Sequence, residues 1–193
     1  MPLSLGLAIA LPSWAASVVG TGRIPIADEA RMRLAIRLAQ ENVERERDGG
    51  GGGGPFGAAV FRDDTGELIG IGVNSVVRLG NSVLHAEPLA LMLAERAVGF
   101  HAFNVPGAPP ATLVTSCDPC AMCLGAALWS GVRRVVCGAT KEDAEAIGFD
   151  EGPVSEDSWA HLERRGVEIV RGVLREEAAA VLRRYQELGR PIY

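Results

Sequence analysis

The stretch ATLVTSCDPCAMCLGAALWSGVRRVVCG, residues 111–138, decides the fold. Its first part, Ala111–Thr115, is a short apolar run that predicts a strand. Pro119–Trp129 then predicts a helix with proline at its favoured first position, and Arg134–Gly138 predicts a second, buried strand. A strand, a helix and another strand in this order are typical of an α/β domain.

Hydrophobic periodicity predicts seven further elements around this stretch. They are a helix at Asp28–Arg47 capped by Asp28, a β-hairpin of Phe56–Arg62 and Glu67–Asn74, a helix at Ala86–Val98 with Leu89, Met92 and Leu93 facing inward, a short helix at Lys141–Ala146, a fifth strand at Val167–Arg171 and a closing helix at Glu176–Leu188. This order predicts an α/β fold with a mixed five-stranded sheet and helices on both faces, a three-layer α/β/α sandwich.

The composition indicates one folded domain that acts on a small molecule. The chain has 193 residues, 48% of them hydrophobic, which is enough for a single domain with a substantial core. Its 19 Lys and Arg against 24 Asp and Glu give a net charge of -5, and the arginines are spread along the chain. We therefore expect neither nucleic acid nor an anionic membrane as a partner, and no apolar run is long enough to predict a membrane span.

Residues 1–26 are predicted to be an extension of the domain at 27–193. Met1–Ala16 is apolar like a signal peptide, but it lacks a basic residue and Pro12 interrupts it, so we predict a cytoplasmic protein. Four cysteines are too few for a disulfide scaffold, which also favours a reducing compartment. The six glycines Gly49–Gly54 are predicted to be a flexible linker, because they lack the Lys-Ser/Thr of a phosphate-binding loop.

Two short motifs carry the chemistry: His-Ala-Glu at 85–87 and Pro-Cys-Ala-Met-Cys at 119–123. Cys120 and Cys123 are three residues apart at a predicted helix start, so both sulfurs point to one side and the helix N-terminus favours their thiolate forms. Together with His85 they offer one imidazole and two thiolates to a zinc ion. Three protein ligands leave the fourth position open for water, as in catalytic zinc sites.

Glu87 is predicted to carry protons. Its spacing of two residues from His85 does not place both side chains on one helix face, so Glu87 is poorly placed as a further ligand, but it can reach the water. Two thiolates cancel the formal charge of zinc, which weakens the activation of water and makes a proton-accepting carboxylate necessary. His-x-Glu followed by Pro-Cys-x-x-Cys is the established pattern of zinc deaminases, so this prediction matches a known motif.

The cysteines alone are compatible with two other sites. A Cys-x-x-Cys pair after a strand is also typical of thioredoxin-like redox proteins, but such a pair needs neither His85 nor Glu87. Cys117 lies three residues before Cys120, so a closed site of three cysteines and His85 would be a structural zinc centre. Cys137, in the middle of a predicted strand, is expected to be a buried apolar residue.

With these motifs the sequence resembles the cytidine deaminase superfamily, and within it the bacterial guanine deaminases, from about residue 27 to residue 193. The general part of the resemblance consists of Gly-Pro-Phe-Gly-Ala at 54–58, Gly-Val-Asn at 72–74 and the two zinc motifs. The more specific part consists of Leu-Gly-Ala-Ala-Leu-Trp at 124–129, Glu-Ala-Ile-Gly-Phe-Asp-Glu at 145–151 and Ile-Tyr at 192–193. Asp118 stands where the family has Glu, and Pro88 where it has an aliphatic residue.

The resemblance implies a cytidine deaminase-like fold, a zinc cofactor and a pocket for a nucleobase. The base-binding residues that it implies are Phe56, Asn74, Ala86, Trp129 and Tyr193. It also implies that Glu151 recognises the substrate and helps to move protons. By residue type, Phe56 offers a stacking face, Asn74 a donor and an acceptor, and Glu151 an acceptor for ring N–H groups. The alternative is structural: strand core for Phe56, a strand-end turn for Asn74, helix core for Trp129 and a solvated loop acid for Glu151.

A homodimer is the oligomeric state that the resemblance implies. In such a dimer the C-terminal segment is exchanged, so that Tyr193 reaches the pocket of a neighbouring chain. The apolar stretch Ala178–Leu182 near the chain end favours the same contact.

Four functions are compatible with the motifs. The first is hydrolytic deamination of guanine to xanthine and ammonia. The second is deamination of another amino-heterocycle, namely an s-triazine such as ammeline, cytosine or a purine nucleoside. The third is deamination of adenosine in tRNA, which requires a cationic surface that a net charge of -5 counts against. The fourth is a non-catalytic zinc-binding module, which would have no use for Glu87.

Overall fold

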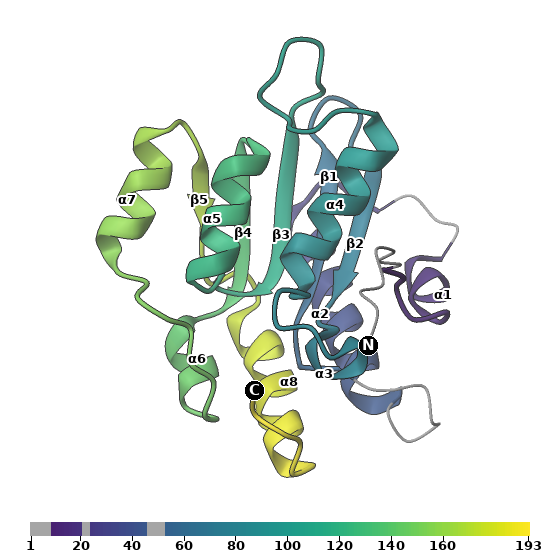
Figure 1. Ribbon diagram of the computed structural model, residues 1–193, viewed down its shortest axis with the longest axis vertical. Helices are drawn as coiled ribbons and strands as arrows, with labels where there is room; N and C mark the ends of the chain where they lie inside the picture. Colours follow the sequence, from purple (N-terminus) through teal and green to yellow (C-terminus); the bar gives the residue numbers. More distant parts are fainter. Residues whose placement is uncertain (1–8, 21–23, 46–52) are drawn as a thin grey trace, which may run out of the picture.

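The fold is built on one mixed sheet of five strands in the order β2-β1-β3-β4-β5 (Figure 1). The structure is a computed structural model that describes residues 9–20, 24–45 and 53–193. The strands are β1 (Gly57–Arg62), β2 (Leu68–Val73), β3 (Ala111–Cys117), β4 (Arg134–Ala139) and β5 (Glu168–Val170). β1 is antiparallel to both β2 and β3, whereas β3, β4 and β5 are parallel to one another.

Helices cover both faces of the sheet. They are α1 (Ala15–Val19), α2 (Asp28–Glu44), α3 (Val76–Leu79), α4 (Ala86–Val98), α5 (Ala121–Ser130), α6 (Lys141–Glu145), α7 (Glu156–Arg164) and α8 (Arg175–Glu187). α2 and α8 pack on one face, and α4 and α5 on the other (Figure 1). The predicted three-layer α/β/α sandwich with a mixed five-stranded sheet is confirmed.

Side chains of the strands alternate between the two faces, as the two-residue period of a strand requires. In β1, Ala59 and Phe61 are buried in the core below α2, whereas Ala58 and Val60 are buried in the core below α4. Both faces are therefore apolar, which agrees with a sheet that is covered on both sides.

A glycine lets α4 approach the sheet closely. A Cβ atom added to Gly72 of β2 would lie 1.9 Å from the carbonyl oxygen of Ala86, the first residue of α4. Only glycine fits at this contact. The start of α4, which carries the His-Ala-Glu motif, is therefore fixed against the sheet.

Three predictions about helix details are wrong. Asp28 is the first helical residue of α2 rather than its cap, and its carboxylate accepts hydrogen bonds of 2.5 and 2.8 Å from Arg134 of β4. α5 begins at Ala121, with Cys120 as its N-cap, so Pro119 precedes the helix. Met92 and Leu93 of α4 are 46% and 38% exposed instead of facing inward.

The apolar stretch near the chain end packs within its own chain. Ala178, Ala179, Val181 and Leu182 of α8 are buried in the same core as α2. Contact with a second chain is therefore not needed to explain this stretch, and the predicted dimer contact stays a prediction.

The N-terminal residues that the structure describes pack on the domain. Ala15 and Val18 of α1 are buried, and the Arg45 guanidinium lies 5.6 Å from the centre of the Trp14 ring. Residues 49–52 of the glycine run lie outside the described residues, so the predicted linker stays a prediction. Within the described ranges, none of the helices has the length and hydropathy that crossing a membrane requires.

Candidate active site

The N-termini of α4 and α5 bring the two sequence motifs together. His85 is the N-cap of α4 and Cys120 is the N-cap of α5, and both have extended backbone angles. Cys123 follows in the first turn of α5 and is fully buried. Nδ1 of His85 lies 3.6 Å from Sγ of Cys120 and 3.6 Å from Sγ of Cys123.

These three donor atoms fit a zinc ion. All of them lie within 4.8 Å of one another, and no other group of three or more His, Cys, Asp or Glu in the described part of the chain meets this criterion. Tetrahedral zinc with Zn–S of about 2.3 Å and Zn–N of about 2.0–2.1 Å requires a sulfur–nitrogen separation of about 3.6 Å. The separations observed with His85 agree with this value. Cys117 is outside the cluster, and its thiol donates to the carbonyl oxygen of Thr140 at 3.5 Å.

The cluster also favours a thiolate. In the metal-free chain, a hydrogen bond from Cys123 outweighs burial and, with help from His85, lowers the pKa of Cys120 to about 4. The same interaction and burial raise the pKa of Cys123. Burial opposes the charged form of His85, but its hydrogen bond to Cys120 and the nearby Glu87 carboxylate raise its pKa overall.

Glu87 lies beside the donor cluster. Its side chain is buried, and its Oε2 atom lies 3.3 Å from Sγ of Cys123. Its Oε1 atom accepts a hydrogen bond of 3.1 Å from the hydroxyl of Thr115 on β3. Burial raises the pKa of Glu87, so this carboxyl group holds a proton more readily than an exposed one.

Glu151 lines the same pocket from the loop after α6. It is 7% exposed, and its backbone carbonyl accepts a hydrogen bond of 3.0 Å from the N–H of Ala121, which fastens this loop to the start of α5. Burial raises the pKa of its side chain to about 8, and the charge of Cys120 adds to this effect. Two carboxyl groups, Glu87 and Glu151, therefore face one small pocket.

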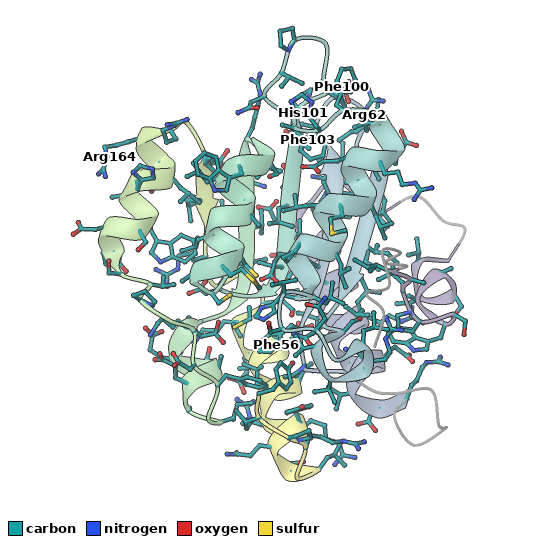
Figure 2. The ribbon with its side chains drawn as sticks, in the orientation of Figure 1. Phe56, Arg62, Phe100, His101, Phe103 and Arg164 are labelled. Atoms are coloured by element: carbon teal, nitrogen blue, oxygen red, sulfur yellow. The ribbon has the colours of Figure 1, made fainter. Side chains whose placement is uncertain are left out.

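Aromatic rings form the wall of the pocket opposite the metal donors. The ring of Phe149 lies 5.0 Å from that of Phe56 and 5.3 Å from that of Tyr193, both at steep angles. Phe56 lies at the end of the molecule where α4 and α5 begin, far from Phe100 and His101 (Figure 2). The pocket is lined by Phe56, His85, Glu87, Asp118, Cys120, Phe149, Asp150, Glu151 and Tyr193.

Asn74 carries an unused donor next to this wall. It is 1% exposed, its Oδ1 atom accepts a hydrogen bond from the N–H of Val76, and its Nδ2 atom is buried without a hydrogen-bond partner. A Cβ atom added to Gly54 would lie 3.2 Å from Cγ of Asn74 and 1.5 Å from the Tyr193 hydroxyl oxygen. Asn74 therefore shapes the turn after β2 and keeps a donor free near Tyr193.

The C-terminal residue, Tyr193, lines a pocket with little free volume. Tyr193 lies in the pocket of its own chain, whereas the resemblance implies that it reaches a neighbouring chain. The remaining free volume is about 30 Å³, room for about one water molecule. Ligand pockets usually measure about 300–1,000 Å³, so Tyr193 must move before a purine base enters.

Three of the predicted base-binding residues, Asn74, Ala86 and Trp129, are not among the residues that line the pocket. Trp129 is on α5 and is 77% exposed, and Ala86 is fully buried at the start of α4. Phe149 lines the pocket but was not predicted as a site residue. The signal for it was its place in the Gly-Phe-Asp-Glu segment that also contains Glu151.

Comparisons with known proteins agree with this site. A family model for the cytidine and deoxycytidylate deaminase zinc-binding region matches residues 26–139. The guanine deaminase of Bacillus subtilis (strain 168) is 32% identical over 148 residues, which cover 77% of this chain and 87% of that protein. A tRNA-specific adenosine deaminase of Buchnera aphidicola subsp. Schizaphis graminum is 31% identical over 160 residues, which cover 80% of this chain and 91% of that protein.

Solved structures also match almost the whole chain. One of them is that of a guanine deaminase from Nitrosomonas europaea, which is 43% identical in sequence. The match covers 97% of this chain and 100% of that chain, with a TM-score of 0.86.

Proposed function

The chain belongs to the cytidine and deoxycytidylate deaminase family, and on that premise we propose that it deaminates guanine by hydrolysis to xanthine and ammonia. The observation that carries the proposal is the convergence of the His85, Cys120 and Cys123 donors with two buried carboxyl groups in one pocket. Guanine is favoured over other bases because relatives named guanine deaminases match 32% to 43% of the aligned residues with high coverage.

Zinc is the proposed cofactor, held by Nδ1 of His85 and the sulfurs of Cys120 and Cys123. When bound, zinc supplies a Lewis acid that makes water a stronger nucleophile. The three donors come from two helix N-termini, whose partial positive charge stabilises thiolates. The Cys117 thiol donates a hydrogen bond to the carbonyl oxygen of Thr140. This supports a site with three protein ligands rather than a closed site with four.

Glu87 is the proposed proton carrier. In the overall reaction a C–O bond forms and the C–N bond to the exocyclic amine breaks, so the two protons of the attacking water must finally be replaced on a ring nitrogen and on the amine, which leaves as ammonia. The Glu87 carboxylate lies beside the donor cluster, where it can accept the first proton and deliver it to the ring. Its raised pKa supports this role, because the protonated intermediate state is then less costly.

Glu151 is proposed to orient the base and to protonate the departing amine. Burial raises its pKa to about 8, which favours the protonated carboxyl group that a proton donor needs. The free Nδ2 donor of Asn74 and the ring of Phe56 are proposed to bind the base, with Tyr193 closing over it. Trp129 is left out because it is 77% exposed on α5, and Ala86 is left out because its side chain is fully buried at the start of α4.

Deamination of adenosine in tRNA is the main alternative, since a tRNA-specific adenosine deaminase is among the relatives. The net charge of -5 argues against an RNA substrate, which is held mainly through its phosphates by basic side chains. Deamination of ammeline, cytosine or a purine nucleoside uses the same chemistry and differs only in the fit of the ring.

The test is ammonia release from a panel of guanine, guanosine, cytosine, adenine, ammeline and tRNA. We expect guanine to give the highest kcat/KM, and Glu87→Gln to lower kcat by at least about 10²–10⁴-fold while the protein retains zinc. Release of ammonia from another member of the panel but not from guanine would overturn the substrate assignment. Full activity of Glu87→Gln would overturn the assignment of the proton carrier.

A homodimer is proposed on a different surface from the one the sequence suggested. α4 and α5 lie side by side (Figure 1), and each carries large exposed apolar side chains: Met92 and Leu93 on α4, and Met122 and Trp129 on α5. Clustered exposed apolar side chains are typical of protein–protein contacts. We expect a dimer by light scattering and a shift to monomer in Trp129→Glu. A fully active monomer at micromolar concentration would refute this proposal.

The cytoplasmic location stays a prediction. All four cysteines, which lie in the described part of the chain, are free thiols, and this is compatible with a reducing compartment.

A further inference from the structure

We propose that Thr115 is a positioning residue that holds the carboxylate of Glu87 in the orientation for proton transfer. Thr115 lies on β3, is fully buried and donates its hydroxyl to Oε1 of Glu87 at 3.1 Å. Neither sequence motif contains this residue. The inference rests on the proposed deaminase reaction, in which Glu87 carries the proton.

Thr115 is the donor that remains when a metal binds. In the described part of the chain, two side chains are hydrogen-bonded to the Glu87 carboxylate: the Thr115 hydroxyl at Oε1 and the Cys123 sulfur at Oε2. A thiol that becomes a thiolate ligand no longer has a proton to donate. Among the described residues, the Thr115 hydroxyl is then the only side-chain donor that still contacts this carboxylate.

The sheet fixes where this hydroxyl points. Thr115 pairs with Ala58 of β1 on one side and with Cys137 of β4 on the other, so its backbone is in the interior of the sheet. A β-branched side chain has few χ1 rotamers, and its hydroxyl direction is therefore set by the strand. This fixed donor selects one orientation of a carboxylate that is itself on the first turn of α4. A misplacement of about 1 Å in a catalytic group can lower the rate by about 10²-fold.

If Thr115 only stabilises the fold, its variants should give a different result. A buried hydroxyl needs a partner, and losing this hydrogen bond would then lower stability without a selective effect on kcat. Thr112 on the same strand provides the matched control, because its hydroxyl donates to Oδ1 of Asp63 at 2.6 Å, away from the pocket residues.

The experiment compares Thr115→Val, which keeps the shape and removes the hydroxyl, with Thr115→Ser, which keeps the hydroxyl, and with Thr112→Val. All are measured for kcat and KM on the base that wild type deaminates fastest, for zinc content and for thermal unfolding. We expect Thr115→Val to lose about 10–100-fold in kcat, with KM within about threefold and zinc retained. Thr115→Ser should recover most of kcat, and Thr112→Val should keep it within about twofold even if it melts earlier.

The outcomes separate this inference from the proposed function. The inference falls if Thr115→Val keeps kcat within about twofold of wild type, or if Thr115→Ser loses as much as Thr115→Val. It also falls if Thr112→Val loses as much kcat as Thr115→Val. Thr115→Ala serves as a second variant without the hydroxyl if Thr115→Val does not fold. If wild type deaminates no base at all, both the inference and the proposed function are wrong.

Discussion

Replacing Arg171 by Met tests how the loop before the zinc ligands is held. Asp118 lies two residues before Cys120, and its side chain is fully buried. Arg171, which follows β5, donates to it from Nε at 3.1 Å and from Nη2 at 2.5 Å, while the guanidinium stacks 4.7 Å above the ring of Trp159. One further donor, the backbone N–H of Lys141, reaches the same carboxylate at 3.3 Å.

The expected loss in the free energy of unfolding depends on how deeply each partner of the Asp118–Arg171 ion pair is buried. Removing one partner of a buried ion pair costs about 3–5 kcal/mol, because the other charge stays buried. Arg171 is 32% exposed and Lys141 still donates, so we expect the lower end for Arg171→Met, about 3 kcal/mol. In Asp118→Asn the arginine left behind is partly hydrated, and the expected loss is only about 1 kcal/mol. For a protein of this size, about 3 kcal/mol lowers Tm by about 6–12 °C.

The assay is thermal unfolding of Arg171→Met, Asp118→Asn and the double variant, together with a zinc competition assay. The double variant should be more stable than Arg171→Met alone, because it no longer buries an unpaired carboxylate. Arg171→Met should also bind zinc more weakly, since the loop that carries Cys120 loses its anchor. The reasoning is refuted if Asp118→Asn costs more than Arg171→Met, or if the double variant is the least stable of the three.

Three other outcomes are expected. Metal analysis should find about one zinc per chain in Cys117→Ala and almost none in Cys120→Ala, because Cys117 is outside the donor cluster; equal loss in both would favour a closed four-ligand site. In the metal-free protein, burial raises the pKa of Glu151 from 4.5 to about 8, so its stabilising contribution is present below pH 4.5 and lost as the pH rises towards 8. Tm of Glu151→Gln should therefore fall less than that of wild type from about pH 5 to 8, and identical Tm profiles would contradict this. Gly72→Ala should lower the free energy of unfolding by about 1–3 kcal/mol in chemical denaturation, because its Cβ would overlap the Ala86 carbonyl; an unchanged value would contradict the close approach.

Most of the long helices and the strands could be predicted from the sequence, but α7 could not. The predicted bounds of α4, Ala86–Val98, agree with the structure at both ends. α7 was missed, because only Trp159 and Leu162 are buried among its nine residues, so its apolar face is small. Its cap residue Ser155 was the available signal, since its side chain takes part in a capping box.

Of the three residues predicted on the inward face of α4, Leu89 is buried, whereas Met92 and Leu93 are exposed for a physical reason. The large side chains of Met92 and Leu93 suggested the buried face, but the contact with β2 leaves room only for small residues. Ala86, Ala90 and Ala94 fill it, because a Cβ at Gly72 would already overlap the backbone of α4. A periodicity of large apolar residues cannot reveal a face that is built from alanine packed on glycine.

In the candidate site, features that depend on residues close together in the sequence could be predicted. Features that depend on contacts between distant residues could not. The metal donors could be predicted because Cys120 and Cys123 are on one helix turn and His85 belongs to a short motif. The contact of Thr115 with Glu87 could not, because it depends on the register of β3 beside β1 and on the packing of α4 over both. Contacts of this kind join residues far apart in the sequence and leave no local spacing to detect.

The strand order of the sheet, rather than either sequence motif alone, brings the residues of the candidate site together. His85 and Glu87 enter with α4, and the cysteines enter with α5, which follows β3. The two helix starts meet only because β1 lies between β2, on which α4 packs, and β3. β3 leads into α5, where Cys120 and Cys123 lie. The same strand contains Thr115, whose hydroxyl contacts Glu87. A shift of β3 by one residue would turn Thr115 to the other face and separate the carboxylate from its donor, so the strand register controls the metal donors and the proposed proton carrier together.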